Sequence, residues 1–230
     1  MGRKNKLKKF AEILAFPNVY ECYDVQAPVL VGSGMQKAEL QGRWQSAHFQ
    51  NTHPITLELA CGGGEYTVEL ARRFPDRNFI GVDVKGNRIW KGAKRALQEN
   101  IANAAFLRTR IEIIDRFFAP GEVDEIWITF PDPFPRGSKE NRRLTSAFFL
   151  EKYRHILQTG GLVHLKHDDP DFYAFTLETI AADERNQLLY KNDDIYAGAL
   201  EFPELGIQTL YESFHLAAGK TIKYVRFRIS

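Results

Sequence analysis

The sequence of 230 residues has only two cysteines, Cys22 and Cys61. Two cysteines cannot form a disulfide framework or a four-cysteine zinc site, and the six histidines show no metal-ligand spacing. We therefore expect a protein that needs no metal. Because disulfide frameworks belong to oxidising compartments, the low cysteine content also favours a reducing, cytoplasmic location.

Long apolar runs are missing as well. The sequence contains no stretch of eighteen apolar residues and no charged-then-apolar leader, so we expect neither a membrane partner nor export. The apolar content of 44% and the charged content of 26% are ordinary for a globular protein. A chain of this length can bury the core of one α/β domain. Its oligomeric state, monomer or homodimer, stays open at this point.

Acidic residues are absent from both ends of the chain. Residues 1–11 carry five Lys or Arg and no acid, and after Glu212 four Lys or Arg follow without any acid. A third basic stretch lies at 136–143. Although the net charge is only +2, this uneven placement predicts a polyanionic partner. A solvated tail at the N-terminus and the polar face of a strand at the C-terminus are the alternatives.

From residue 55 onward, apolar runs alternate with amphipathic segments. We expect strands at 55–60, 78–82, 104–108, 125–129, 162–166, 187–190 and 221–228. We expect helices at 65–73, 86–100, 111–117, 146–157, 171–182 and 210–217, with Gly160-Gly161 marking the end of the fourth. This alternation predicts an α/β fold of three layers, with a mainly parallel seven-stranded sheet and helices on both faces. We place a basic extension at 1–50 and one domain at 51–230.

A glycine-rich turn joins the first expected strand to its helix. Leu57-Glu58-Leu59-Ala60-Cys61 leads into Gly62-Gly63-Gly64, and the strand at 78–82 ends in Asp83. Glycines let the backbone approach a ligand closely, and an acid about twenty residues later is where nucleoside-binding folds hold ribose. Thr67 stands where a third glycine would complete a dinucleotide fingerprint. Glu58 likewise disfavours an anionic pyrophosphate and suits a ligand with a cationic end.

The most informative segment is Phe130-Pro131-Asp132-Pro133-Phe134-Pro135. It follows the apolar run 125–129 and precedes Arg136, Lys139, Arg142 and Arg143. Proline on both sides places the Asp132 carboxylate on a stiff loop. A fixed acid beside aromatic rings can bind and stack a heterocycle, while the bases that follow can hold its phosphates.

Polar residues lie at or just beyond the carboxyl ends of five of the expected strands. These are Glu58, Asp83, Arg108–Arg110, Asp132 and Asp168. Ligands of open α/β sheets bind outside the carboxyl ends of the strands. The sequence therefore predicts one active site to which all five strand ends contribute.

The glycine turn with Glu58 and Asp83 resembles the S-adenosylmethionine loop of class I methyltransferases, which have a Rossmann-like fold. From about Lys6 to Phe227 the chain is similar to the bacterial tRNA (guanine-N7)-methyltransferases, which methylate a guanosine in the variable loop of tRNA. Three motifs carry this resemblance: Phe130–Pro135 with Arg142-Arg143-Leu144, Leu165-Lys166-His167-Asp168, and Thr209-Leu210-Tyr211-Glu212 with Phe214 and Gly219.

The resemblance implies roles for individual residues. The S-adenosyl-L-methionine site would be formed by Glu58, Gly62, Gly64, Asp83, Arg110 and Asp132. Asp132 would also be catalytic. Contacts to the tRNA would come from Arg136, Asp168, Thr209, Leu210, Tyr211 and Glu212. The chain departs from the family pattern at Ala60 in the glycine turn, at Arg110, where relatives have a short polar or acidic residue, and at Arg136, where Lys is common.

Guanine N7 chemistry suits these residues. The N7 lone pair attacks a sulfonium methyl directly, no proton leaves, and the product base is cationic. The protein must therefore orient the base and stabilise positive charge, which an anionic Asp132 or Glu212 can do. Two alternatives remain at this point: a methyltransferase that acts on exocyclic amines of DNA or RNA, and a nucleic-acid-binding protein on an inactive methyltransferase fold.

Overall fold

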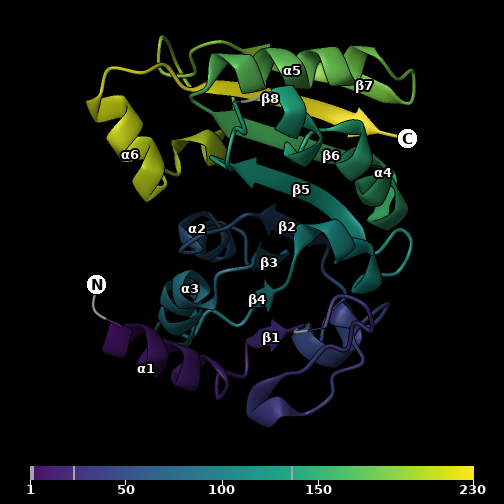
Figure 1. The fold of residues 1–230 in the computed structure, drawn as a ribbon, viewed down its shortest axis with the longest axis vertical. Helices are drawn as coiled ribbons and strands as arrows, with labels where there is room; N and C mark the ends of the chain where they lie inside the picture. Colours follow the sequence, from purple (N-terminus) through teal and green to yellow (C-terminus); the bar gives the residue numbers. More distant parts are fainter. Residues whose placement is uncertain (1–2, 23, 136) are drawn as a thin grey trace. The chain divides into compact units, whose positions relative to one another are not determined.

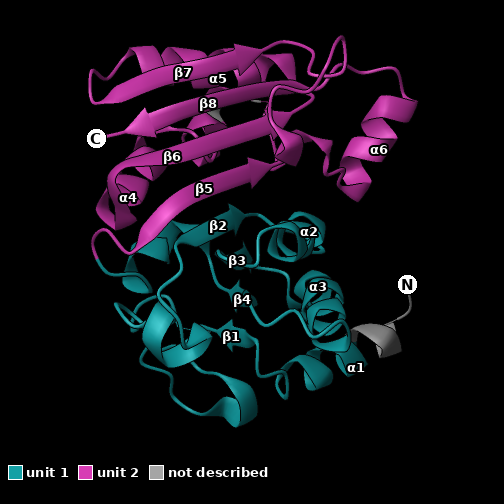
Figure 2. Ribbon diagram, turned by 180° about the vertical axis from the view of Figure 1, so that it is seen from behind, with its two compact units in different colours: residues 1–119 teal, residues 120–230 magenta. Residues whose placement is uncertain are grey.

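The computed structural model of the chain describes residues 3–22, 24–135 and 137–230. These residues form two compact units, 1–119 and 120–230, coloured separately in Figure 2. Within the described residues, none of the helices has the length and apolar character needed to cross a membrane.

The first unit is built on four parallel strands in the order β1-β4-β3-β2 (Figure 1). Its strands are β1 (Val19–Glu21), β2 (Ile55–Leu59), β3 (Asn78–Asp83) and β4 (Ala104–Arg108). Its helices are α1 (Arg3–Ile13), α2 (Glu65–Arg73) and α3 (Gly86–Gln98), with short helical turns at Ser33–Met35, Trp44–Phe49 and Ile111–Arg116. β2 and β3 are buried along their whole length, including the polar residues Thr56, Glu58, Asn78 and Asp83, as expected for parallel strands that are covered on both faces.

The second unit has a mixed sheet in the order β5-β6-β8-β7. Its strands are β5 (Val123–Thr129), β6 (Leu157–His167), β7 (Asn186–Asn192) and β8 (Lys223–Ile229). β5 and β6 are parallel, whereas β8 runs antiparallel to both β6 and β7. Its helices are α4 (Ala147–Ile156), α5 (Pro170–Ala181) and α6 (Leu210–Ala217), with turns at Gly137–Arg142 and Pro203–Gly206. Helices α4 and α5 cover the same face of this sheet (Figures 1 and 2).

The predicted α/β architecture is confirmed, and all seven predicted strands are present. An eighth strand, β1, lies in the basic extension at 1–50, for which no strand was predicted. One boundary was wrong: Gly160-Gly161 lie inside β6 and do not end α4, which stops at Ile156. Gly160 has a φ of 78°, so the glycine pair allows an irregular backbone within a strand. The domain boundary at residue 50 stays a prediction.

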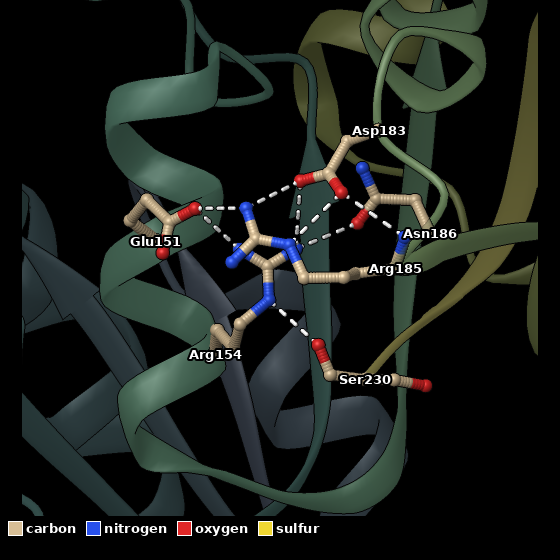
Figure 3. A network of polar contacts seen from close by, with 6 residues as sticks. All are labelled: Glu151, Arg154, Asp183, Arg185, Asn186 and Ser230. Atoms are coloured by element: carbon tan, nitrogen blue, oxygen red, sulfur yellow. Dashed lines mark hydrogen bonds and ion pairs between the residues drawn. The ribbon is translucent and has the colours of Figure 1, made fainter.

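A network of hydrogen bonds and ion pairs connects Ser230 to side chains of the second unit (Figure 3). Arg154 of α4 donates to the Ser230 carbonyl at 2.7 Å and to Asp183 at 3.2 Å. Arg185 donates to Glu151 at 2.6 Å and to Asp183 at 2.7 Å. The hydrogen bond from Arg185 lowers the pKa of Asp183 to about 2. The network joins α4, the turn before β7 and the last residue of the chain.

Candidate functional site

The glycine turn after β2 contains three left-handed residues within five positions. Ala60, Gly62 and Gly64 have φ values of 59°, 55° and 68°. The two glycines serve different purposes. A Cβ on Gly64 would lie 2.5 Å from the Phe106 ring, so that glycine permits close packing of the turn on β4. A Cβ on Gly62 would meet only the Ala60 carbonyl, at 4.0 Å, and its backbone therefore borders open space.

Asp83 at the end of β3 is buried and bridges two backbone segments. Its Oδ2 accepts a hydrogen bond from Gly62 N at 3.0 Å, and its Oδ1 accepts one from Lys85 N at 2.7 Å. A carboxylate offers about four lone-pair positions, so each oxygen keeps one for a further donor. The structure thus brings Asp83 and the glycine turn together, as the sequence predicts.

Glu58 lies one strand away and is also buried. Its Oε2 accepts hydrogen bonds from Thr67 N at 2.8 Å and from Thr67 Oγ1 at 2.5 Å. Thr67 is in the first turn of α2, where the backbone N–H groups have no partner within the helix. Glu58 therefore supports the start of α2 in addition to its predicted ligand role.

The two arginines after β4 differ in their surroundings. Arg108 donates to Glu21 at 2.8 Å and its guanidinium lies 5.0 Å from the centroid of the Phe10 ring. Arg110 is exposed, and Glu112 accepts its hydrogen bond at 3.0 Å, which raises the pKa of the Arg110 guanidinium. No buried partner directs Arg110 toward Asp83 within the described part of unit 1. Its cofactor role stays a prediction.

The described part of the basic N-terminal stretch, residues 3–11, lies in α1, which packs against α3. Trp90 Nε1 donates to Glu12 at 2.8 Å. The ammonium groups of Lys9 and Lys94 lie 4.3 Å and 4.7 Å from the centroid of the Trp90 ring, which is the distance of a cation–π contact. The α1–α3 contact leaves Lys8 largely exposed.

In the second unit, Asp132 lies on the loop that follows β5. Its side chain is exposed, and its Oδ1 accepts a hydrogen bond from Phe134 N at 3.1 Å. Phe130 and Phe134 have φ values of 48° and 43°. A left-handed conformation is costly for bulky residues and persists only where the surroundings impose it. Strain at two residues that flank one acid is typical of a functional site.

Two buried side chains impose the conformation of this loop. Arg143 donates from Nε to the Pro133 carbonyl at 2.9 Å, and its guanidinium lies 4.6 Å from the centroid of the Phe175 ring. His167 donates from Nε2 to the Pro131 carbonyl at 2.9 Å. Burial lowers the pKa of His167, so the imidazole is neutral. The run of bases at 136–143 predicts that Arg143 holds phosphates, but in the structure Arg143 is buried and fixes the Asp132 loop.

Asp168 follows β6 and is buried among cations. Its Oδ2 lies 2.6 Å from Lys220 Nζ and 3.3 Å from His215 Nδ1. Burial is the largest single influence and opposes ionisation of Asp168. The hydrogen bond from Lys220 and the attraction of His167, His215 and Lys220 together outweigh it, so the pKa of Asp168 is lowered. The cap of α5 is the neighbouring Asp169, which accepts from Phe172 N at 2.7 Å.

The segment Thr209–Glu212 forms the first turn of α6. The Thr209 hydroxyl accepts from Glu212 N at 3.1 Å, and Glu212 Oε2 accepts from Thr209 N at 3.4 Å. This reciprocal pair is a capping box. Glu212 is fully buried, with its Oε1 2.7 Å from Lys166 Nζ and accepting from Tyr196 Oη at 2.7 Å.

The remaining predicted site residue, Arg136, lies outside the described residues. Within unit 1, the structure joins Glu58, Gly62 and Asp83 at the carboxyl ends of two adjacent strands. Within unit 2, Phe130 stacks on His167 and His215, which links the Asp132 loop to the ends of β6 and α6. A search of the described residues finds no group of His, Cys, Asp and Glu that could hold a metal ion.

Sequence reasoning missed Lys166 as a partner of Glu212 and Arg143 as a support of the Asp132 loop. The lysine and the glutamate are separated by 46 residues, so no local spacing indicates that they pair. The sequence marked Lys166 through the motif Leu165-Lys166-His167-Asp168 at the end of a predicted strand, but it did not indicate the partner of Lys166.

Comparisons with known proteins agree with this geometry. The family described as "Putative methyltransferase" matches residues 52–224. The tRNA (guanine-N(7)-)-methyltransferase of Christiangramia forsetii is 47% identical over 230 residues, which is 100% of both chains. That of Porphyromonas gingivalis is 53% identical over 191 residues, 82% of this chain and 76% of the relative. Among solved structures, the 16S rRNA methyltransferase KamB matches 86% of this chain and 97% of its own, with a TM-score of 0.61 and 16% identity. The likeness to KamB shows the shared methyltransferase fold.

Proposed function

Because this chain belongs to the tRNA (guanine-N7)-methyltransferase family, we propose that it transfers the methyl group of S-adenosyl-L-methionine to N7 of a guanosine in the variable loop of tRNA. The observation that carries the proposal is the 47% identity that extends over the full length of the Christiangramia forsetii relative. The buried acid beside a glycine turn and the strained loop around Asp132 supply residues suited to each part of the reaction.

The residues of unit 1 fit S-adenosyl-L-methionine. When bound, this molecule supplies an electrophilic methyl group on a sulfonium. The open space beside Gly62 admits a ligand against the backbone, and the unused lone pairs of Asp83 can accept from the ribose hydroxyls. The buried Glu58 carboxylate gives the turn a negative charge, which suits the cationic amino-acid end. Gly64 contributes to the cofactor site by allowing the glycine turn its shape. We assign Arg110 to the adenine end of S-adenosyl-L-methionine.

Asp132 is assigned both to the cofactor site and to catalysis. With its own lone pair, guanine N7 would form the new bond to the methyl carbon while the S–CH₃ bond breaks and its electron pair stays on sulfur, so no base is needed to remove a proton. Positive charge develops on the guanine as the C–N bond forms. The Asp132 carboxylate accepts from the N1–H and N2–H groups of the base and stabilises that charge. Its stiff loop holds the carboxylate in place, so that little reorganisation accompanies transfer.

The tRNA contacts come from two parts of the chain. The basic extension at 1–50 binds phosphates, and the methyltransferase domain at 51–230 supplies Arg136, Asp168 and the segment Thr209–Glu212. Of these, Leu210 and Tyr211 are exposed on α6 and can touch the substrate directly. The Glu212 carboxylate is fully buried and bonded to Lys166, Tyr196 and the Thr209 backbone N–H, whereas Asp132 is exposed, so Asp132 is the better candidate for holding the guanine.

The proposal is tested by incubating the protein with methyl-labelled S-adenosylmethionine and an unmodified tRNA transcript. Borohydride followed by aniline cleaves RNA at 7-methylguanosine. We expect label in the tRNA and one cleavage site in the variable loop. A transcript with that guanosine replaced by adenosine is the matched control and should show neither. Label without cleavage would contradict the proposal and would favour methylation of an exocyclic amine.

A further inference from the structure

Helix α6 carries three large apolar side chains on its outer face. Leu210, Tyr211 and Phe214 are 51%, 46% and 60% exposed. Positions 210, 211 and 214 fall within about 100° of one another around a helix, so the three side chains share one face. Surface residues of this size are normal when single, but three in one and a half turns form a contiguous apolar surface.

The opposite face of α6 is fixed by a buried ion pair. Lys166 and Glu212 are both 0% exposed, with Nζ 2.7 Å from Oε1. Lys166 also donates to the carbonyls of Leu205 at 2.7 Å and Ile207 at 3.0 Å. These three bonds use every N–H of the ammonium and tie β6 to the turn that leads into α6. Burial lowers the pKa of Lys166 in spite of the attraction of Glu212.

The C-terminal half of α6 is held as well. His215 lies 3.3 Å from Asp168, and Lys220, just beyond the helix, lies 2.6 Å from the same carboxylate. The His215 ring stacks on Phe130 with an interplanar angle of 14°. A short surface helix is therefore anchored at both ends by charged groups, while its apolar face points outward.

A buried ion pair is an expensive way to stabilise a fold, since apolar residues of similar volume often do as well. The pair does give directional control, because it fixes the rotation of α6 about its axis. From these observations we infer that Tyr211 and Phe214 form a platform on which an unpaired base of the tRNA stacks, and that Lys166 is a positioning residue for it. This inference rests on the proposed function.

The surroundings of the platform favour RNA as its occupant. No acidic residue follows Glu212, whereas Lys220, Lys223, Arg226 and Arg228 do. Of these cations, Lys220 lies just beyond α6 beside Asp168, and Lys223 pairs with His167 at the end of β6. Phosphates that flank an unpaired base would meet these two cations, and aromatic stacking is the usual way in which proteins hold such bases. A second copy of this chain, which carries the same cations, would be repelled at this face.

Phe214 variants test the platform. We expect Phe214→Ala to raise the Kd for an unmodified tRNA transcript at least fivefold, the lower range for loss of one stacked base, and Phe214→Trp to stay near wild type. Phe148→Ala is the matched control, because Phe148 is a 51% exposed aromatic residue on α4 of the same unit. Equal Kd values for Phe214→Ala and Phe148→Ala would overturn the inference. So would a change in solution mass of Phe214→Ala with an unchanged Kd, which would indicate a dimer face.

Lys166 is tested through the same readout. We expect Tyr196→Phe, which removes one donor to Glu212, to raise the KM for tRNA at least threefold, and Lys166→Met to raise it further if it folds. Tyr224→Phe is the control: it removes a buried 2.7 Å hydrogen bond to His164 on β6 but does not touch α6. If the KM for tRNA rises in proportion to the loss of thermal stability in both Tyr196→Phe and Tyr224→Phe, the Lys166–Glu212 pair has only a structural role. That result would contradict the inference.

The wild-type protein separates the two proposals. If it labels tRNA at N7 and Phe214→Ala binds tRNA normally, the platform is wrong and the proposed function stands. If wild type does not label tRNA at all while Phe214→Ala raises the Kd for tRNA and Phe148→Ala does not, the proposed function fails and the platform stands.

Discussion

Replacing Asp132 by Asn separates the charge of this residue from its shape. Asn keeps an Oδ1 that can accept the 3.1 Å hydrogen bond from Phe134 N, so the loop conformation is retained. Asp132 is exposed and not part of the core. We therefore expect the unfolding temperature of Asp132→Asn to stay within about 2 °C of wild type. This shift corresponds to a change of less than about 1 kcal/mol in the free energy of unfolding.

The catalytic loss follows from the missing charge. Two unit charges about 4 Å apart interact by roughly 4 kcal/mol at an effective dielectric constant of about 20. Because Asp132 is exposed, water screens part of that interaction, and we take about 2–3 kcal/mol as lost from the barrier. This corresponds to a decrease in turnover on the order of 10²-fold, similar to the loss of a single transition-state donor in other enzymes.

The assay is single-turnover methyl transfer at saturating S-adenosylmethionine and tRNA, which isolates the chemical step. N7 attack releases no proton, so hydroxide cannot replace Asp132. We expect the defect of Asp132→Asn to be the same from pH 7 to pH 9. A rate that recovers about tenfold per pH unit would refute this reasoning, because it would show that Asp132 removes a proton, as an exocyclic amine requires.

Four further predictions concern other parts of the chain. Asp83→Ala should weaken S-adenosylmethionine binding by roughly 1.5–3 kcal/mol in calorimetry, through loss of charge-assisted hydrogen bonds to ribose; unchanged affinity in a folded variant would remove Asp83 from the site. Deleting residues 1–9 should raise the KM for tRNA and reduce the slope of log KM against log salt by up to about 3–4 units, with cofactor affinity as the control. Arg143→Met should lower turnover, and it should lower the free energy of unfolding by about 2–3 kcal/mol, because a buried charge-assisted hydrogen bond to the Pro133 carbonyl is lost. Normal turnover would show that the Asp132 loop does not need Arg143. Asp183 has its pKa depressed to about 2 by Arg185, so its stabilisation is complete above about pH 4 and is lost as the pH falls toward 2; urea unfolding of Asp183→Asn should lack that part of the pH dependence.

Local chemistry made much of the first unit predictable. The bounds of α2 and β4 were predicted to the residue, because a glycine turn and a buried strand each leave a short-range pattern. The contact between Asp83 and the glycine turn follows from parallel strands, whose carboxyl ends meet at one edge. β1 was missed because three residues between polar loops carry almost no periodicity.

The buried side chains that hold the Asp132 loop and α6 in the second unit could not be predicted from the sequence in this way. Arg143 stands in a run of bases, and such runs are usually solvated. Its burial depends on Phe172 and Phe175 of α5, some thirty residues further along the chain. Lys166 and Glu212 are equally remote in sequence. Long-range pairing of buried charges is decided by the packing of the unit, and residue spacing carries no record of it.

The central claim is that guanine N7 itself attacks the methyl group. The most direct measurement uses a tRNA in which the one target guanosine of the variable loop is replaced by 7-deazaguanosine, where a C–H group stands in place of N7. We predict that the protein binds this tRNA with normal affinity and transfers no methyl group to it, while the intact transcript is labelled to one methyl group per molecule. Equal labelling of both tRNAs would contradict the account.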